Sequence, residues 1–141
     1  MGYTHYWFDR PETLENYGTL CEDVDKIGVY CNNVGIKLAG YGVSLDGYYE
    51  GAPLHNSEFI SFNGVGENGH ETLHLPKNSK NPFSDSSSFC KTARKPYDLA
   101  VCLVLLRMAE IVPGFTFESD GDLDSEPEWL TAKRAYKEIF G

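Results

Sequence analysis

The sequence predicts a single α+β domain in which a mostly antiparallel sheet packs against about three helices. Its 141 residues suffice for one hydrophobic core, and a hydrophobic content of 41% is typical of a folded globular chain. Strand-like segments follow one another instead of alternating strictly with helices, which favours antiparallel pairing. Neither a repeat nor a linker divides residues 1–141. The expected order of elements is β-α-β-β-β-α-β-α.

The first half of the chain is expected to hold four strands and one helix. The aromatic segment 3–8 fits a strand, and Asp9 with Glu12 forms a capping pair for the helix that follows. Apolar residues recur at helical spacing over 14–34, and Gly35 ends that helix. Three further strands are expected over 36–45, 58–64 and 71–75.

The second half predicts a loop, two helices and a strand. Residues 76–89 are rich in Lys, Asn, Ser and Pro and have the composition of a loop. The helix expected over 97–111 is apolar nearly all round, so it should be central and buried. A strand over 115–119 follows. A Ser-x-x-Glu pair, Ser125 and Glu128, is expected to cap the last helix.

Composition and charge exclude several classes of protein. The net charge of −9 argues against a protein that binds duplex nucleic acid, because such proteins need a basic surface. No apolar run approaches the ~20 residues of a membrane span, and the N-terminus lacks the pattern of a signal peptide. We therefore expect a cytoplasmic protein with reduced cysteines, located in the host cytoplasm if a phage encodes it.

Two familiar motifs overlap in GVGENGHETLH, residues 64–74: the dinucleotide-binding G-x-G-x-x-G and the zinc-protease H-E-x-x-H. Both motifs need a helix here, but Gly69 and Pro76 leave room for only one turn. In a strand, His70 and His74 would lie about 13 Å apart, too far for one metal ion. We therefore expect a glycine turn between two strands, with no metal site and no cofactor. A zinc hydrolase acting through HETLH is kept as a hypothesis for function, ranked third after the two hypotheses that close this section.

Two weaker patterns have simpler explanations. The D-x-D-x-D spacing over 120–124 resembles the start of a calcium loop, but Ser125 stands where that loop requires Gly. Acidic residues before a helix N-terminus are favourable in any case, because they face the positive end of the helix dipole. Cys90 lies beside Lys91 and is either a reactive thiolate or, as we expect, a buried and inert cysteine.

The segment FCKTARKPYD, residues 89–98, is the predicted ligand site. It concentrates cations in an acidic protein, and Pro96 begins a buried helix whose first N–H groups need partners. A basic loop that leads into a helix N-terminus can bind phosphate or carboxylate. The alternative is that Asp98 caps the helix and that the lysines are merely solvated. The predicted ligand-binding residues are Lys91, Thr92, Arg94, Lys95 and Tyr97, joined by Asn63 and Trp7.

Any turnover of the ligand would need a general acid or base near these cations. The candidates are His5, Glu71, Asp98 and Asp120, since burial beside a cation could tune one of them. Aromatic side chains of the N-terminal strand, Tyr6 among them, could stack on a base or a sugar.

Several segments together resemble an uncharacterised family of bacteriophage and bacterial proteins with scattered eukaryotic members. They are MGYTHYW at the start, FNG followed by ET, FCKT-x-x-KPYD, and SDG before a Trp. The resemblance covers nearly the whole chain but supplies no mechanism. It implies only which positions to examine: Thr4, His5, Tyr6, Trp7, Asn63, Gly64, Glu71, Lys91, Thr92, Lys95, Tyr97, Asp98, Asp120 and Gly121.

The leading hypothesis is a small protein that binds, and could turn over, a phosphorylated or otherwise anionic small molecule such as a nucleotide derivative. The alternative is a phage-type acidic interaction protein that inhibits a host factor through its acidic segment 118–128. A protein partner is therefore the second expected ligand class, after an anionic small molecule.

Overall fold

The computed structural model describes residues 3–42, 47–78 and 88–141. These residues form seven strands and three α-helices, which confirms the α+β class. In chain order the elements are β1 (Thr4–Phe8), α1 (Tyr17–Asn33), β2 (Leu38–Gly42), β3 (Gly47–Glu50), β4 (Phe59–Gly64), β5 (Leu73–Pro76), β6 (Phe89–Lys91), α2 (Asp98–Ile111), β7 (Thr116–Ser119) and α3 (Pro127–Phe140). A 3-10 turn, η2 (Gly66–Asn68), precedes β5. None of the helices in these ranges is long and apolar enough to span a bilayer.

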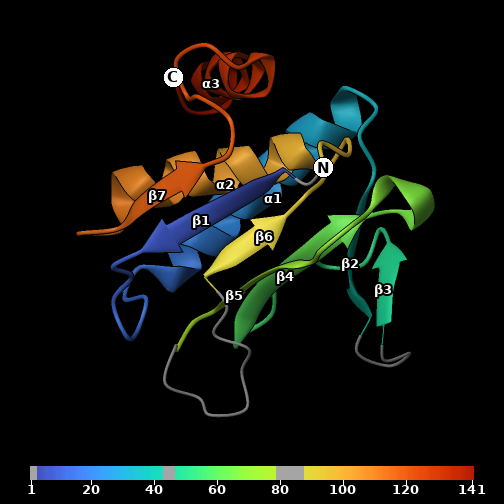
Figure 1. The fold of residues 1–141 in the computed structure, drawn as a ribbon. Coiled ribbons are helices and arrows are strands. Elements are labelled where there is room, and N and C mark those ends of the chain that lie inside the picture. Colours follow the sequence, from blue (N-terminus) through green and yellow to red (C-terminus); the bar gives the residue numbers. More distant parts are fainter. Residues whose placement is uncertain (1–2, 43–46, 79–87) are drawn as a thin grey trace.

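The strands form two sheets in which every pairing is antiparallel. The three-stranded sheet has the order β6-β1-β7, and the four-stranded sheet has the order β3-β2-β4-β5 (Figure 1). The Glu71 amide, just before β5, donates to the Lys91 carbonyl at the end of β6 over 3.1 Å. This hydrogen bond links the two sheets close to the predicted ligand segment.

Strand β1 runs through the middle of its sheet and alternates between two environments. His5 and Trp7 point into the core and are buried, whereas Thr4 and Tyr6 lie on the opposite face and are half-buried. This period of two is what a strand with one covered face requires. Because His5 pairs with Cys90 and with Ser119, the inward row across the sheet is partly polar.

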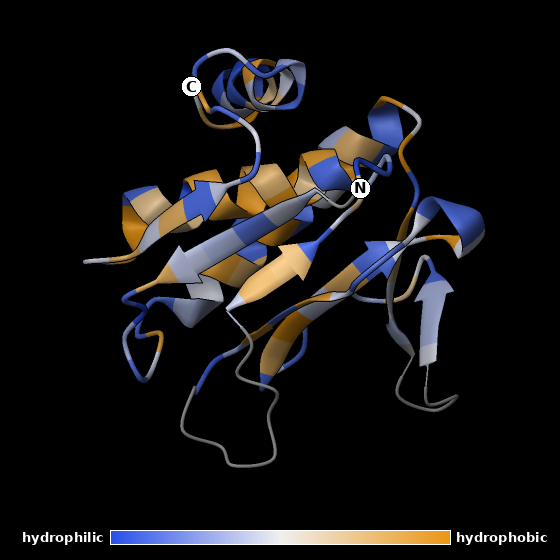
Figure 2. Ribbon diagram, viewed as in Figure 1, coloured by the Kyte–Doolittle hydropathy of each residue, from blue (hydrophilic) through white to orange (hydrophobic). Residues whose placement is uncertain are grey.

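Helix α2 is central, as its apolar sequence predicts. It packs against α1, α3 and β7, and Figure 2 shows it apolar along most of its length while α3 carries more hydrophilic residues. In Figure 1, α1 and α2 lie behind the strands and α3 packs on α2. The first residue of α2, Asp98, is nevertheless a buried acid. The functional question therefore begins at the N-terminus of this helix.

The element boundaries differ from the sequence prediction at three places. Helix α1 begins at Tyr17 and not near Asp9, because Arg10 Nη1 donates to the Pro76 carbonyl over 2.7 Å and holds the preceding segment against the end of β5. Strands β3 and β6 were not predicted. Helix α3 has Glu126 at its N-cap without a side-chain cap, so the expected Ser125–Glu128 box is absent there. Most of the predicted 76–89 loop, residues 79–87, lies outside the described residues.

Candidate functional site

Five polar side chains from four parts of the chain meet behind β1 and form what we call the buried polar cluster. The members are His5 on β1, Thr92 just after β6, Asp98 and Cys102 on α2, and Ser119 at the end of β7. Asp98 and Cys102 are one helical turn apart, so both point to the same side of α2. His5, Thr92 and Cys102 have no solvent exposure, and Asp98 has 4%. Such a cluster in a core is costly unless each polar group has a partner.

The imidazole of His5 bridges two oxygen atoms. Nε2 lies 2.6 Å from Asp98 Oδ1, and Nδ1 lies 2.8 Å from Ser119 Oγ. Ser119 Oγ already accepts hydrogen bonds from two obligatory donors, the Gly121 amide at 3.0 Å and Trp129 Nε1 at 2.9 Å. Because a hydroxyl oxygen has two lone pairs, Ser119 uses its own hydrogen to donate to Nδ1. The hydrogen-bond pattern therefore places the imidazole proton on Nε2, which donates to Asp98.

The Asp98 carboxylate accepts three hydrogen bonds. His5 Nε2 and Thr92 Oγ1 donate to Oδ1, the latter over 2.5 Å, and the Cys102 thiol donates to Oδ2 over 3.5 Å. All three donors are neutral in this arrangement, so the cluster carries one buried negative charge at the start of α2. The positive end of the α2 dipole helps to stabilise it.

The Ser119–His5–Asp98 chain resembles a catalytic triad only in composition. In nucleophilic catalysis the serine oxygen attacks with a lone pair. Both lone pairs of Ser119 Oγ accept from Gly121 and Trp129. The geometry therefore supports an organising role for Ser119 and not a nucleophilic one.

Tyr3 adds an unusual group at the edge of the cluster. Its hydroxyl is buried and makes no hydrogen bond of acceptable geometry among the described residues. Burial raises the pKa of Tyr3 to about 12, while the nearby Ser119 hydroxyl acts in the opposite direction. Its ring stands edge-on to His5, with centroids 5.1 Å apart, and the Arg94 guanidinium carbon lies 4.1 Å from the ring centroid.

Burial keeps the cysteines of the described core protonated. It raises the pKa of the Cys90 thiol to about 12 and that of Cys102 well above its ordinary value, with the Asp98 charge acting in the same direction. A thiol with a raised pKa is a poor nucleophile at neutral pH. The structure confirms that Cys90 is buried, and its lack of reactivity stays a prediction.

A surface hollow of about 260 Å³ lies where α2 and α3 begin, and we call it the α2/α3 hollow. Its lining residues are Ile36, Arg94, Lys95, Pro96, Asp98, Leu99, Pro127, Glu128 and Thr131. Asp98 and Pro127 are the first residues of their helices, so two helix N-termini face one space. Asp98 forms part of the wall and connects the hollow to the buried polar cluster.

The two cations of the α2/α3 hollow differ in their partners. Arg94 pairs with Glu126 at 3.1 Å and also with Glu128, and the Glu126 hydrogen bond is the main cause of the raised pKa of Arg94. Lys95 is half-buried, and no carboxylate of the described residues lies within ion-pairing distance of it. An incoming anion would therefore meet Lys95 directly and would compete with two glutamates for Arg94.

Lys91 belongs to the opposite face of the three-stranded sheet. It pairs with Thr4, whose side chain points away from the core. The turn that follows contains Ala93 and Arg94 with φ angles of +52° and +58°, and this reversal sends Lys95 to the N-terminus of α2. The predicted cation cluster is thus divided between the two faces of the sheet.

Glu71 and Asp120 both hold backbone groups in place. Glu71 Oε1 accepts from the Lys91 amide over 2.7 Å. Asp120 is exposed and accepts from the Thr4 amide over 3.0 Å and from the Tyr6 hydroxyl over 3.1 Å. Neither residue lines the α2/α3 hollow, so of the four predicted acid–base candidates only His5 and Asp98 come together.

Three predicted ligand-binding residues have structural partners instead. Trp7 is buried in the core and cannot stack on a ligand from solvent. Tyr97 is also buried, and its hydroxyl donates to the Glu71 carbonyl over 2.5 Å. Asn63 is occupied by the turn after β4: Nδ2 donates to the His70 carbonyl, and Oδ1 accepts from the His70 amide.

The HETLH segment contains no helix, as its neighbours predict. Residues 70–72 precede strand β5, which contains His74. His70 is exposed, whereas His74 Nδ1 lies 3.2 Å from Ser61 Oγ. Within the part of the chain that the structure describes, neither histidine belongs to a metal-capable group of three residues, and neither do the acids of 120–124.

The acidic segment 118–128 is largely engaged within the chain. Besides the contacts of Asp120 and the two glutamates on Arg94, Asp124 pairs with Lys133 at 3.1 Å. Asp122 Oδ1 accepts from the Asp124 amide. These contacts give the segment a structural explanation, and the inhibitor hypothesis stays a prediction.

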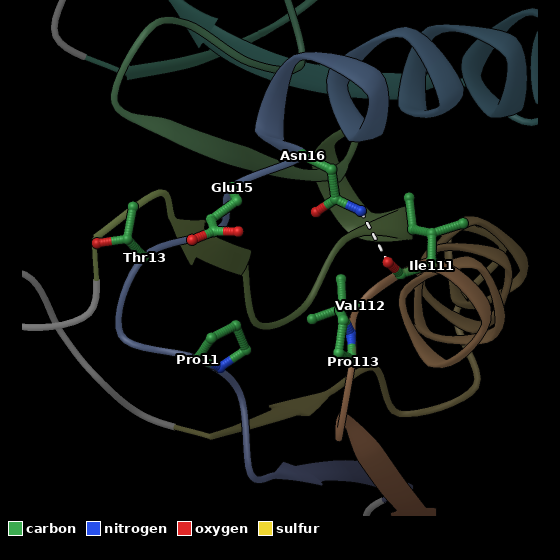
Figure 3. Close-up of a pocket in the computed structure, with 7 residues that line it drawn as sticks. All are labelled: Pro11, Thr13, Glu15, Asn16, Ile111, Val112 and Pro113. Atoms are coloured by element: carbon green, nitrogen blue, oxygen red, sulfur yellow. Dashed lines mark hydrogen bonds between the residues drawn. The ribbon is translucent and has the colours of Figure 1, made fainter.

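A second hollow, of about 470 Å³, lies at the other end of α2 (Figure 3). Asn16 closes one side of this hollow. Its Nδ2 donates to the Ile111 carbonyl over 2.7 Å and so gives a hydrogen-bond partner to a carbonyl of the last turn of α2. Pro11, Val112 and Pro113 supply apolar walls. None of the predicted site residues lines this hollow.

No family model, curated protein or solved structure matches this chain. The functional argument therefore depends on the geometry alone. Sequence reasoning identified His5, Thr92 and Asp98 but missed Cys102 and Ser119. The spacing of Cys102, four residues after Asp98 on a helix, was the available signal for the first; for Ser119 the sequence offers only its position before Asp120.

Proposed function

We propose that the protein binds a phosphorylated or otherwise anionic small molecule in the α2/α3 hollow. The observation that carries the proposal is Lys95, a half-buried cation without an ion-pair partner in the described chain, placed where two helix N-termini converge. The positive end of the dipole at a helix N-terminus favours an anion, and a lysine adds a full charge.

The size of the hollow limits the ligand. At about 260 Å³ it is close to the lower bound of roughly 300 Å³ for small-molecule pockets. A phosphoryl or carboxylate group with a small body fits this space better than a whole dinucleotide. The Thr131 hydroxyl adds one hydrogen-bonding group, and Ile36 and Leu99 supply apolar contact.

The proposal concerns binding and not turnover. The Asp98 carboxylate borders the hollow, but its three hydrogen bonds come from the buried polar cluster. Glu128 is already occupied by Arg94. Both carboxylates that line the hollow, Asp98 and Glu128, are therefore already engaged by other residues of the described chain.

Isothermal titration with inorganic phosphate and with a nucleoside monophosphate tests the proposal. Lys95→Ala should weaken binding about ten-fold or more, because it removes a charge that an anion would contact in a partly buried site. The double variant Glu126→Gln with Glu128→Gln should tighten binding, because Arg94 becomes available. Lys91→Ala, on the opposite face of the sheet, is the matched control and should bind as the wild type does. Equal affinity in wild type and Lys95→Ala would refute this site.

A further inference from the structure

We propose that His5, Asp98 and Cys102 form a binding site for one divalent transition-metal ion of the zinc type. The ligand atoms are His5 Nε2, a carboxylate oxygen of Asp98 and Cys102 Sγ, which lie within 4.8 Å of one another. This inference is independent of anion binding at the α2/α3 hollow and uses none of its cations. It also differs from the HETLH prediction, whose histidines do not meet.

The spacing of the ligand atoms fits tetrahedral coordination. Zn–S bonds of about 2.3 Å and Zn–N or Zn–O bonds of about 2.0 Å place sulfur about 3.5 Å from the other ligand atoms. Cys102 Sγ lies 3.7 Å from His5 Nε2 and 3.5 Å from Asp98 Oδ2. With Oδ2 as the ligand, Oδ1 keeps its hydrogen bond from Thr92.

The chemistry of the three groups selects the kind of metal. A thiolate and an imidazole favour zinc and its neighbours over calcium and magnesium, which prefer oxygen atoms alone. The thiolate and the carboxylate carry two negative charges, which balance a divalent ion. Metal binding would therefore neutralise the single buried charge that the cluster otherwise carries.

The surrounding residues suit metal ligands. Thr92 holds the second oxygen of Asp98, and Ser119 holds Nδ1 of His5, as outer partners of metal ligands commonly do. On binding, the Cys102 thiol releases one proton to solvent and the imidazole proton moves from Nε2 to Nδ1. Ser119 Oγ then accepts from Nδ1 in place of one of its two present donors, the Gly121 amide or Trp129 Nε1, and turns its own hydrogen towards the buried Tyr3 hydroxyl, which makes no hydrogen bond in the described chain.

Asp98 also supplies a route for the ion. His5, Thr92 and Cys102 have no solvent exposure, but Asp98 forms part of the wall of the α2/α3 hollow. An ion that enters the hollow reaches a carboxylate first and then the thiol one helical turn further along α2. Three protein ligands leave a fourth coordination position, as in zinc sites that bind a water molecule.

Titration of the metal-stripped full-length protein with Co²⁺ tests the site. We expect one equivalent to bind and to give the near-ultraviolet charge-transfer absorption of a cobalt–thiolate bond. Cys102→Ser should abolish that absorption and weaken binding at least ten-fold. Cys31→Ser is the matched control: Cys31 is an equally buried thiol on α1 outside the cluster, and this variant should behave as the wild type does. Zinc should displace the cobalt.

Two outcomes would overturn the proposal. The first is a wild-type protein that gives no thiolate absorption at any cobalt concentration. The second is an absorption that survives in Cys102→Ser and disappears in Cys31→Ser. If Cys102→Ser does not fold by circular dichroism, X-ray absorption of the zinc-loaded wild type decides instead. A single sulfur neighbour at about 2.3 Å supports the site, and a shell of nitrogen and oxygen alone refutes it.

Discussion

His5 and Asp98 lie 93 residues apart in the chain and form a buried hydrogen bond of 2.6 Å between Nε2 and Oδ1. One comes from the central strand of the three-stranded sheet, the other from the first turn of the central helix. Their contact therefore joins the two elements about which the core is built. The first expected outcome below depends on it.

Removing the Asp98 carboxylate should destabilise the fold strongly. Asp98→Ala leaves His5 Nε2, the Thr92 hydroxyl and the Cys102 thiol without their acceptor, and we expect a loss of about 3–5 kcal/mol in the free energy of unfolding. Asp98→Asn keeps one acceptor oxygen and should cost clearly less. Urea denaturation of both variants measures the difference, and equal losses would show that the hydrogen bonds are not the source of the stability.

Tyr3→Phe should stabilise the protein or leave its stability unchanged, although it removes a polar group from a buried residue. The Tyr3 hydroxyl has no hydrogen-bond partner in the described chain, so its burial costs desolvation without compensation. We expect a gain of about 1 kcal/mol in thermal or urea unfolding. A loss of more than that amount would show that the hydroxyl has a partner, such as Ser119.

Gly121→Ala should destabilise the fold, because a Cβ at this position would lie 2.1 Å from the Tyr3 hydroxyl oxygen. The expected loss is about 1–3 kcal/mol, typical of overpacking. The double variant with Tyr3→Phe should recover part of this loss, since the first atom to clash is gone while Tyr3 Cζ, at 2.9 Å, stays. A double-mutant cycle measures the coupling between the two substitutions. If their effects on the free energy of unfolding simply add, the contact between position 121 and the Tyr3 hydroxyl is contradicted.

Stability should fall with rising pH above about 9 because of the buried thiols. Burial raises the pKa of Cys31 and of Cys90 from 9.0 to about 12. Between these values the unfolded thiol has lost its proton while the folded one keeps it, so the unfolded state binds fewer protons and the free energy of unfolding decreases. Each thiol contributes a slope of about 1.4 kcal/mol per pH unit in this window. In Cys31→Ser the free energy of unfolding should decline less steeply than in wild type from pH 9 to 11. Identical slopes would count against the raised pKa of Cys31.

Asn63→Ala should affect stability and not ligand binding. Its side chain makes four hydrogen bonds in the turn after β4, with the Gly64 and His70 amides, the His70 carbonyl and Thr72 Oγ1. We expect a loss of about 2–3 kcal/mol in unfolding free energy. Phosphate affinity, measured in the same titration as for Lys95→Ala, should not change. A weaker affinity in the folded variant would return Asn63 to the ligand site.

Local sequence patterns were sufficient to predict the elements that are long and have a regular distribution of apolar residues. Helix α2 runs from Asp98 to Ile111, close to the predicted 97–111, because its sequence is apolar throughout and follows a proline. Strand β6 was missed because it has three residues and depends on pairing with β1, far away in the chain. The start of α1 was misplaced because Arg10 binds the carbonyl groups of Pro76 and Lys77, a contact that no local capping pattern reveals.

The sequence by itself determined the α+β class, the central helix and the failure of both motifs in GVGENGHETLH, since glycine and proline decide those questions locally. It also marked His5, Thr92 and Asp98. Only the tertiary structure decided how the residues are grouped. The alternation of strands and the left-handed turn at Ala93 and Arg94 send Lys91 to one face and Lys95 to the other. Packing of α2 against β1 and β7 brings Cys102 and Ser119 to His5, because contacts between distant segments follow from the fold and not from spacing along the chain.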